Sequence, residues 1–318
     1  TLRGLYHWQP RTDSFTFEKF SKTLGKDFYT TVIIADKLGR IWFGAGDNAI
    51  QGKQGLYCYD PKTGQTKYFG NDKKDTTSLS GNYIGSLLQD HLGNIWVGTG
   101  EGGMCRYNEK LQNFTRYPFN KNTTFNRSAN GALDDDQVQV IYEDKSGTIW
   151  VGTNNGGLNR FNRETGTFTS YNQQLPGFSC VISIYEDARN LLWVGTYFGG
   201  LFSFDSKTSR AKMYSEKDGL LYNGASGIIE DNNENLWLAS YRGISIFSPQ
   251  RNKVRNLTIA NGLPSENLTT AFKTSSGQFL FSGNDGGFFS FSPEDLIPDP
   301  HTPMVHIESV DIAMPDAD

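Results

Sequence analysis

The side chains that most often carry catalysis or hold metal ions are few and scattered in this sequence. Metal sites need histidine, cysteine or carboxylate ligands that converge, and a general base must reach the substrate. The cysteines show no CxxC spacing, and their odd number cannot close into a full set of disulfides. We therefore predict free thiols and no catalytic residue, metal site or cofactor. The residues concerned are His7, His91, His301, His306, Cys58, Cys105 and Cys180.

Three adjacent carboxylates, Asp134, Asp135 and Asp136, form the densest acidic group. Three neighbouring side chains cannot all converge on one ion, and the alternating spacing of a calcium loop is missing. We expect a solvated acidic turn at this point.

A second group of residues could bind a ligand without reacting with it. Aromatic faces beside amide and guanidinium donors suit sugar rings and their carboxylates or sulfates, through stacking and bidentate hydrogen bonds. In this hypothesis Tyr197 or Tyr241 carries the ring face, and Arg242 binds an acidic substituent. Each candidate follows a short motif that recurs along the chain. The candidate set is Tyr197, Tyr241, Arg242, Asn154, Asn155, Glu101, Asn284 and Asp285, with Phe198 beside them.

The recurring motif is IWVGT in its clearest copies. The tryptophans stand at 42, 96, 150, 193 and 237, and Leu280 takes the sixth place, so the intervals are 54, 54, 43, 44 and 43 residues. This is the period of a four-stranded propeller blade, with two insertions. The 35 glycines, 22 phenylalanines and 15 tyrosines also favour an all-β fold of short strands.

Each copy of the motif predicts the same arrangement of strands. An aspartate lies six residues before each tryptophan, and apolar alternation before the aspartate indicates a first strand that turns into the tryptophan strand. The third strand is apolar on both faces, as expected for a sheet packed between two other sheets. A small residue two positions after the tryptophan indicates a close neighbouring backbone. We therefore expect the tryptophans to be structural, wedged between blades.

The N-terminal residues supply only the back half of a further copy. Gly4, Leu5 and Trp8 match the third strand, and Phe15 to Phe17 match the fourth. We therefore predict that residues 1–297 form a seven-fold β-propeller of four-stranded blades, with six full blades plus an N-terminal half-blade. A closed six-bladed ring with a displaced N-terminal hairpin is the alternative.

The loops of such a ring divide between two rims. Loops after the second strands share one rim with the connections into the next first strand, and the hairpin turns lie on the other rim. The candidate binding residues therefore share a rim, which none of the histidines reaches. The insertions at 46–55 and 119–136 also lie on or beside this rim, and loops of that length are usually functional or disordered.

The motif resembles the two-component regulator propeller repeat of Bacteroidetes-type hybrid sensors. It is carried by DHLGNIWVGTGEGGMCRY (90–107), DKSGTIWVGTNNGGLNRF (144–161) and DARNLLWVGTYFGGLFSF (187–204). The resemblance covers roughly residues 1–297. It implies the periplasmic sensor region of a hybrid two-component histidine kinase, dimeric in the full receptor and joined to the inner membrane by a downstream helix.

Residues 298–318 differ in character, since a proline-rich linker leads into a short alternating strand. In the family that the chain resembles, a small tyrosine-rich immunoglobulin-like domain begins here, so the segment would hold its first strand. No kinase, receiver or DNA-binding sequence is present, and signalling is implied by the resemblance alone.

Charge and hydropathy narrow the classes of function. The formal charge of -4 offers no basic stripe for nucleic acid, and no apolar run approaches the length of a membrane span. The first hypothesis is a sensor module that recognises an oligosaccharide or another small polar ligand. The second is a non-catalytic propeller scaffold for protein–protein contact or dimerisation, with the ligand bound elsewhere in the receptor.

Overall fold

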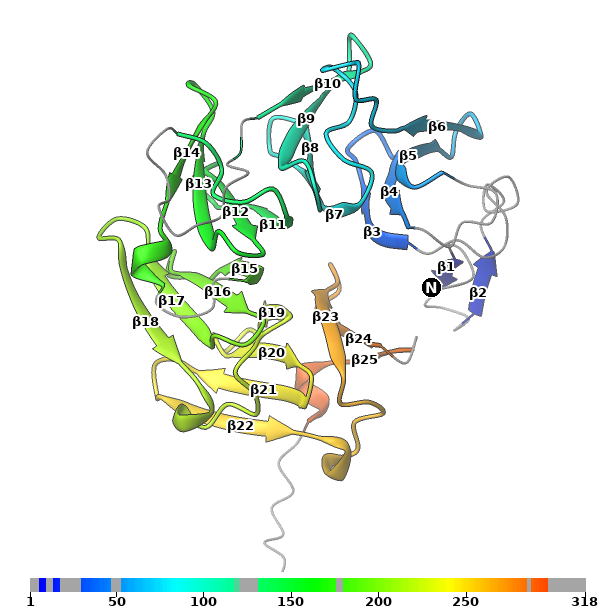
Figure 1. Cartoon of the computed structure of the whole chain (residues 1–318). Coiled ribbons are helices and arrows are strands. Elements are labelled where there is room, and N and C mark those ends of the chain that lie inside the picture. The colour runs from blue at the N-terminus through cyan, green and yellow to red at the C-terminus, as the bar shows by residue number, and fades with distance from the viewer. Residues whose placement is uncertain are drawn as a thin grey trace, which may run out of the picture.

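Short antiparallel strands follow one another as blades around a central axis (Figure 1). The computed structural model describes residues 6–9, 14–17, 30–46, 53–117, 119, 131–175, 180–284 and 287–296. Six sheets form the blades of a propeller, which confirms the predicted all-β propeller class. Within the described ranges no helix has the length and apolar character needed to span a membrane.

The first strand of each blade lies nearest the central axis, and the later strands follow outward in chain order. The first two blades hold β3 (Thr30–Ala35), β4 (Ile41–Ala45), β5 (Gly55–Asp60) and β6 (Gln65–Phe69), then β7 (Ile84–Gln89), β8 (Ile95–Thr99), β9 (Met104–Asn108) and β10 (Asn113–Arg116). The third and fourth hold β11 (Val138–Glu143), β12 (Ile149–Thr153), β13 (Leu158–Asn162) and β14 (Thr167–Ser170), then β15 (Val181–Glu186), β16 (Leu192–Thr196), β17 (Leu201–Asp205) and β18 (Arg210–Tyr214). The last two hold β19 (Gly227–Glu230), β20 (Leu236–Ser240), β21 (Gly243–Ser248) and β22 (Lys253–Leu257), then β23 (Leu268–Lys273), β24 (Phe279–Gly283) and β25 (Phe288–Phe291).

A hydrogen bond between the repeated aspartate and tryptophan explains their constant spacing. In the third blade Trp150 Nε1 donates to Asp144 Oδ2 at 2.8 Å, and Asp144 Oδ1 accepts from the backbone N–H of Thr148 at 2.9 Å. One carboxylate therefore closes the turn and orients the indole of the following strand. The equivalent indole–carboxylate distances are 2.8 to 3.0 Å for Trp42, Trp96, Trp193 and Trp237.

The tryptophans are wedged between blades, as predicted. Trp150 is 1% exposed, and its ring meets that of Phe204 in the next blade with centroids 5.7 Å apart. The small residue after it is also explained, because a Cβ atom at Gly152 would collide with Val181 at the start of the next blade. The core is thus a series of layers between sheets.

A second recurring contact, which the sequence reasoning missed, joins the second, third, fourth and fifth blades each to the blade before it. The residue just before the repeated aspartate accepts a hydrogen bond from the first turn of the preceding blade. Glu143 accepts from the backbone N–H of His91 at 2.7 Å, and Glu186 accepts from that of Lys145 at 2.5 Å. Glu230 accepts from Ala188 at 3.1 Å in the same way. We call this contact the inter-blade latch.

The sixth blade departs from the prediction of six full blades. The described residues give it three strands, and β25 is followed by Pro293, which begins a 3-10 turn at Pro293–Asp295. Proline has no N–H to donate to a strand ladder, so the chain leaves the sheet at this point.

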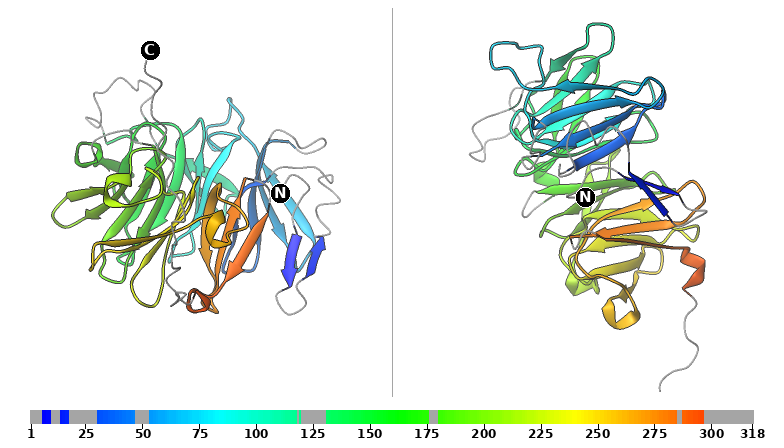
Figure 2. Two further views of the ribbon diagram at one scale, coloured as in Figure 1. Left: turned by 90° about the horizontal axis from the view of Figure 1, so that it is seen from below. Right: turned by 90° about the vertical axis from the view of Figure 1, so that its right-hand side faces the viewer.

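The N-terminal strands form a hairpin of their own. β1 (Tyr6–Gln9) pairs with β2 (Ser14–Phe17) as a separate two-stranded sheet. Figures 1 and 2 show it beside the gap in the ring between the first and sixth blades. Its assignment as half of a seventh blade remains a prediction. Gly4, Leu5 and the segment 298–318 lie outside the described residues.

Candidate ligand-binding site

Irregular positions in the innermost strands shape one mouth of the ring. The register shifts between Val138 and Val140 in β11, and between Val181 and Ser183 in β15. β7 and β23 shift at the equivalent place. A β-bulge adds one residue to a strand and changes the direction in which that residue's side chain points. In β11, β15 and β23 the inserted residues Gln139, Ile182 and Thr269 line a single cavity.

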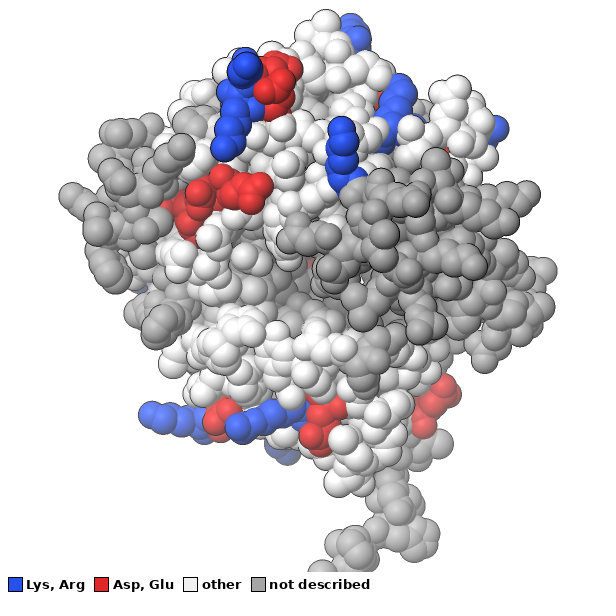
Figure 3. Space-filling model, turned by 45° about the vertical axis from the view of Figure 1, so that its right-hand side comes forward, with Lys and Arg blue, Asp and Glu red and all other residues white. Residues whose placement is uncertain are grey.

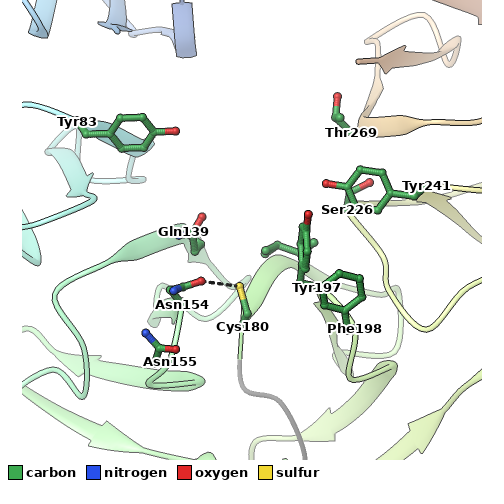
Figure 4. A pocket seen from close by; sticks show the side chains of 11 residues that line it. Tyr83, Gln139, Asn154, Asn155, Cys180, Tyr197, Phe198, Ser226, Tyr241 and Thr269 are labelled. Carbon is green, nitrogen blue, oxygen red and sulfur yellow. Dashed lines mark hydrogen bonds between the residues drawn. The ribbon is translucent and has the colours of Figure 1, made fainter. Parts of the chain in front are cut away.

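This cavity has a volume of about 630 Å³, within the range of small-molecule sites. Its walls come from the second through sixth blades, from loops after the second strands and from the approaches to the first strands. Figure 4 shows side chains of these blades directed toward a common space. As predicted, the loops after the second strands and the connections into the first strands lie on the same rim, around this cavity.

Four of the eight predicted binding residues lie together in the cavity wall, namely Asn154, Asn155, Tyr197 and Tyr241. The rings of Tyr197 and Tyr241 belong to neighbouring blades, and their centroids are 5.5 Å apart at an interplanar angle of 74°. Their role in binding remains a prediction.

Among the described residues, Arg242, Glu101 and Asn284 do not line this cavity. Arg242 Nη1 lies 3.6 Å from Glu216 Oε1, with 64% of the arginine side chain exposed. Glu101 accepts a hydrogen bond from the backbone N–H of Asn82 at 2.8 Å. The side chain of Asn284 donates to Asn267 Oδ1 at 3.1 Å, and Asp285 lies outside the described residues.

The aromatic wall is a closed set of edge-to-face contacts. Phe198 lies against Tyr197 at 4.2 Å and against Tyr222 at 6.0 Å, measured between ring centroids. Tyr222 in turn lies 5.9 Å from Tyr241. Such contacts hold each ring in place without a ligand. The wall is therefore already ordered for stacking.

The opposite wall presents amide groups. Cys180 Sγ donates to Asn154 Oδ1 at 3.1 Å, as the dashed line in Figure 4 marks. This bond occupies the amide oxygen and leaves the amide nitrogen of Asn154 as a donor. The backbone N–H of Asn155 donates to Asp135 Oδ2 at 2.7 Å, which anchors the loop.

The expectation of a solvated acidic turn at 134–136 is wrong. Asp135 is 1% exposed and Asp134 is also buried, because this segment packs against the loop after β12 and receives the N–H of Asn155. In the described part of the chain no group of three histidine, cysteine, aspartate or glutamate residues could hold a metal ion.

Two titratable groups in the cavity stay protonated at neutral pH. Burial, with a hydrogen bond to Tyr197, raises the pKa of Tyr241 to about 12. Burial raises the pKa of the Cys180 thiol to about 11, and the charge of Asp135 adds to the increase.

Sequence reasoning missed six lining residues, although the repeat contained a signal for most of them. Four lie five positions before the repeated aspartate or its replacement Thr274: three at a bulge of the first strand, and Ser226 directly before β19. Aligning the blades on the aspartate would have placed them on the inner surface of the ring. The missed residues are Gln139, Ile182, Ser226 and Thr269 at that position, and Tyr83 and Cys180 in the preceding loops.

Comparison with known proteins gives a family match. The model described as two component regulator propeller matches residues 78–101, 132–155 and 177–198. A curated relative, histidine kinase P4 of Formosa agariphila, is 32% identical over 259 residues. That match covers 79% of this chain but only 18% of the relative.

Solved structures share the fold at low sequence identity. The extracellular domain of a putative hybrid two component system from B. thetaiotaomicron superposes with a TM-score of 0.70 at 21% identity, over 91% of this chain and 37% of that one. PorZ, an essential surface component of the type-IX secretion system of Porphyromonas gingivalis, gives a TM-score of 0.61 at 16% identity. That match covers 87% of this chain and 41% of PorZ.

Proposed function

Because the chain belongs to the two-component regulator propeller family, we propose that it is the extracytoplasmic ligand-recognition module of a hybrid two-component receptor. An oligosaccharide or another small polar ligand binds in the cavity at the mouth of the ring. The signal passes to a cytoplasmic histidine kinase elsewhere in the receptor. The module is periplasmic and non-catalytic, and the full receptor is a homodimer.

The observation that carries this proposal is the convergence of two kinds of wall in one cavity. Tyr197 and Tyr241 offer aromatic faces from one side, and Asn154 and Asn155 offer amides from the other. Sugar rings combine an apolar face with hydroxyl groups at the edge, so they can contact both walls at once. The hydrogen bond from the Cys180 thiol to Asn154 Oδ1 leaves the amide nitrogen of Asn154 as a donor for a ligand.

Calorimetric titration of this chain against plant and host oligosaccharides tests the proposal. We expect heat and saturation with at least one member of the panel. Tyr241→Ala should weaken that binding. Absence of heat with every member would contradict a glycan site in this propeller.

The exposed side chains at the two ends of the ring support the half-blade. Ile33 of the first blade is 48% exposed, whereas its equivalents Leu87 and Ile141 are 7% and 5% exposed beneath a preceding blade. Phe272 of the sixth blade is 63% exposed, with no following blade in the described residues. In the proposed complete molecule the β1–β2 hairpin supplies half of a seventh blade in this gap. An immunoglobulin-like domain then begins within 298–318.

The same exposed residues favour a second candidate function. Ile33 and Phe272 would also suit contact with another protein, in a non-catalytic scaffold or a dimer whose ligand binds elsewhere in the receptor. The titration separates the two functions, since a scaffold would give no heat with any oligosaccharide.

A further inference from the structure

The cavity wall contains no charged side chain among the described residues. Its polar groups are the hydroxyls of tyrosine, serine and threonine, the side-chain amides and one thiol. An ion held against these walls loses part of its hydration without gaining a counter-charge from them, which makes its binding costly. Hydroxyl groups, by contrast, can find donors and acceptors on both walls.

Arg242 and Glu216, two charged residues beside the aromatic wall, do not line the cavity. Arg242 stacks over Tyr222 at 5.7 Å and pairs with Glu216 at 3.6 Å. Glu216 and Lys217 line a separate surface groove of about 300 Å³ that meets the cavity only at Phe198. In the view of Figure 3 the described Lys, Arg, Asp and Glu side chains lie mainly in the upper and lower parts of the surface.

A buried carboxylate adds to the discrimination against anions. Asp135 is held directly behind the amide wall by the N–H of Asn155 at 2.7 Å. Salt screens buried charges less than exposed ones. The negative charge of Asp135 therefore repels an anion in the cavity, although Asn155 lies between them. The same negative charge also disfavours a thiolate at the neighbouring Cys180, because it raises the pKa of that thiol.

We propose that this cavity selects an uncharged, hydroxyl-rich ligand, of which a neutral oligosaccharide is the leading class, and excludes anionic sugars. This inference rests on the proposed function and narrows it. It also reverses the sequence-based expectation that Arg242 binds an acidic substituent. Tyr241 stacks on the ring face, with the Tyr197 ring inclined to it at 74°, and Asn154 donates to a ring hydroxyl.

The test uses pairs of oligosaccharides that differ in charge. Trigalacturonic acid is compared with its methyl ester, a sulfated disaccharide with its desulfated form, and neutral xylo- and cello-oligosaccharides complete the panel. We expect every saturating member to be uncharged, with its charged counterpart at least about tenfold weaker. The affinity of the neutral member should be the same at low and high salt.

The matched variants are Arg242→Ala and Arg210→Ala, each of which removes one exposed arginine. Arg210 lies on the outer strand β18, away from the cavity. Both variants should keep the dissociation constant of the neutral member within about twofold. A charged member that binds tighter than its uncharged form, or a tenfold loss in Arg242→Ala alone, would overturn the inference and leave the glycan site standing. Absence of binding by every member would overturn both proposals.

Discussion

At the scale of single residues, the paired aspartate and tryptophan of the first five blades hold the fold together. We expect Trp150→Ala to destabilise the protein by about 3–5 kcal/mol, because a large, fully buried ring is replaced by a cavity between two blades. The substitution also leaves Asp144 Oδ2 without its indole donor. Urea unfolding followed by circular dichroism measures the effect. Leu92→Ala, in an exposed turn, is the control, and a midpoint as little changed as in that control would refute the structural role.

The same aspartates predict how stability depends on pH. Burial alone would raise the pKa of Asp90, but hydrogen bonds from Arg163, Trp96 and Asn94 outweigh it and hold the pKa below the ordinary value of 3.8. The pKa of Asp36 is lowered in the same way, against burial, by Trp42 and Arg40. A carboxyl with a depressed folded pKa stabilises the fold above its unfolded pKa and loses this effect as pH falls through the folded value.

We therefore expect stability to fall as the pH drops below about 4. Unfolding midpoints measured at pH 7, 5, 4 and 3 would show this loss. Asp90→Asn cannot be protonated, so it should be less stable than wild type at pH 7 and lose less on acidification. Parallel curves for the two proteins would contradict the role of Asp90.

At the scale of elements, the inter-blade latch explains how one blade fixes the next. Glu186 of β15 accepts from the backbone N–H of Lys145 in the preceding blade, and it is buried there. We expect Glu186→Ala to cost about 1–3 kcal/mol, since a partly buried N–H loses its acceptor. Glu186→Gln keeps an acceptor oxygen and should cost less. Unfolding curves of the two variants compare them directly, and equal losses would show that the hydrogen bond contributes nothing.

The strands were predictable from the sequence because each blade repeats the same local pattern. The aspartate-to-tryptophan spacing and the glycine after the tryptophan each correspond to a contact in the structure, at Asp144, Trp150 and Gly152. The bulge residues were not found because strict alternation was assumed along the first strands. One inserted residue, Gln139 in β11, is enough to turn a side chain into the central cavity.

At the scale of the whole molecule, the repeat pattern predicted that the candidate residues share one rim, and the structure brings four of the eight into one cavity wall. Tyr197 and Asn154 line the cavity, each directly after the second strand of its blade. Arg242, one residue beyond Tyr241, points to the outer surface and pairs with Glu216. Which side chain of a loop faces the axis depends on local backbone directions that the repeat pattern does not contain.

The claim that the cavity at the ring mouth is the ligand site is tested most directly by the affinity of Tyr241 variants. The measurement is the dissociation constant for the tightest-binding oligosaccharide, with the unfolding midpoint recorded alongside. Removal of the stacking ring in Tyr241→Ala should weaken binding about ten- to a hundredfold, whereas Tyr241→Phe keeps the ring and should lose less. Both variants should unfold near the wild-type midpoint, since Tyr241 lies in a loop at the rim. An unchanged affinity in Tyr241→Ala would contradict this account of the site.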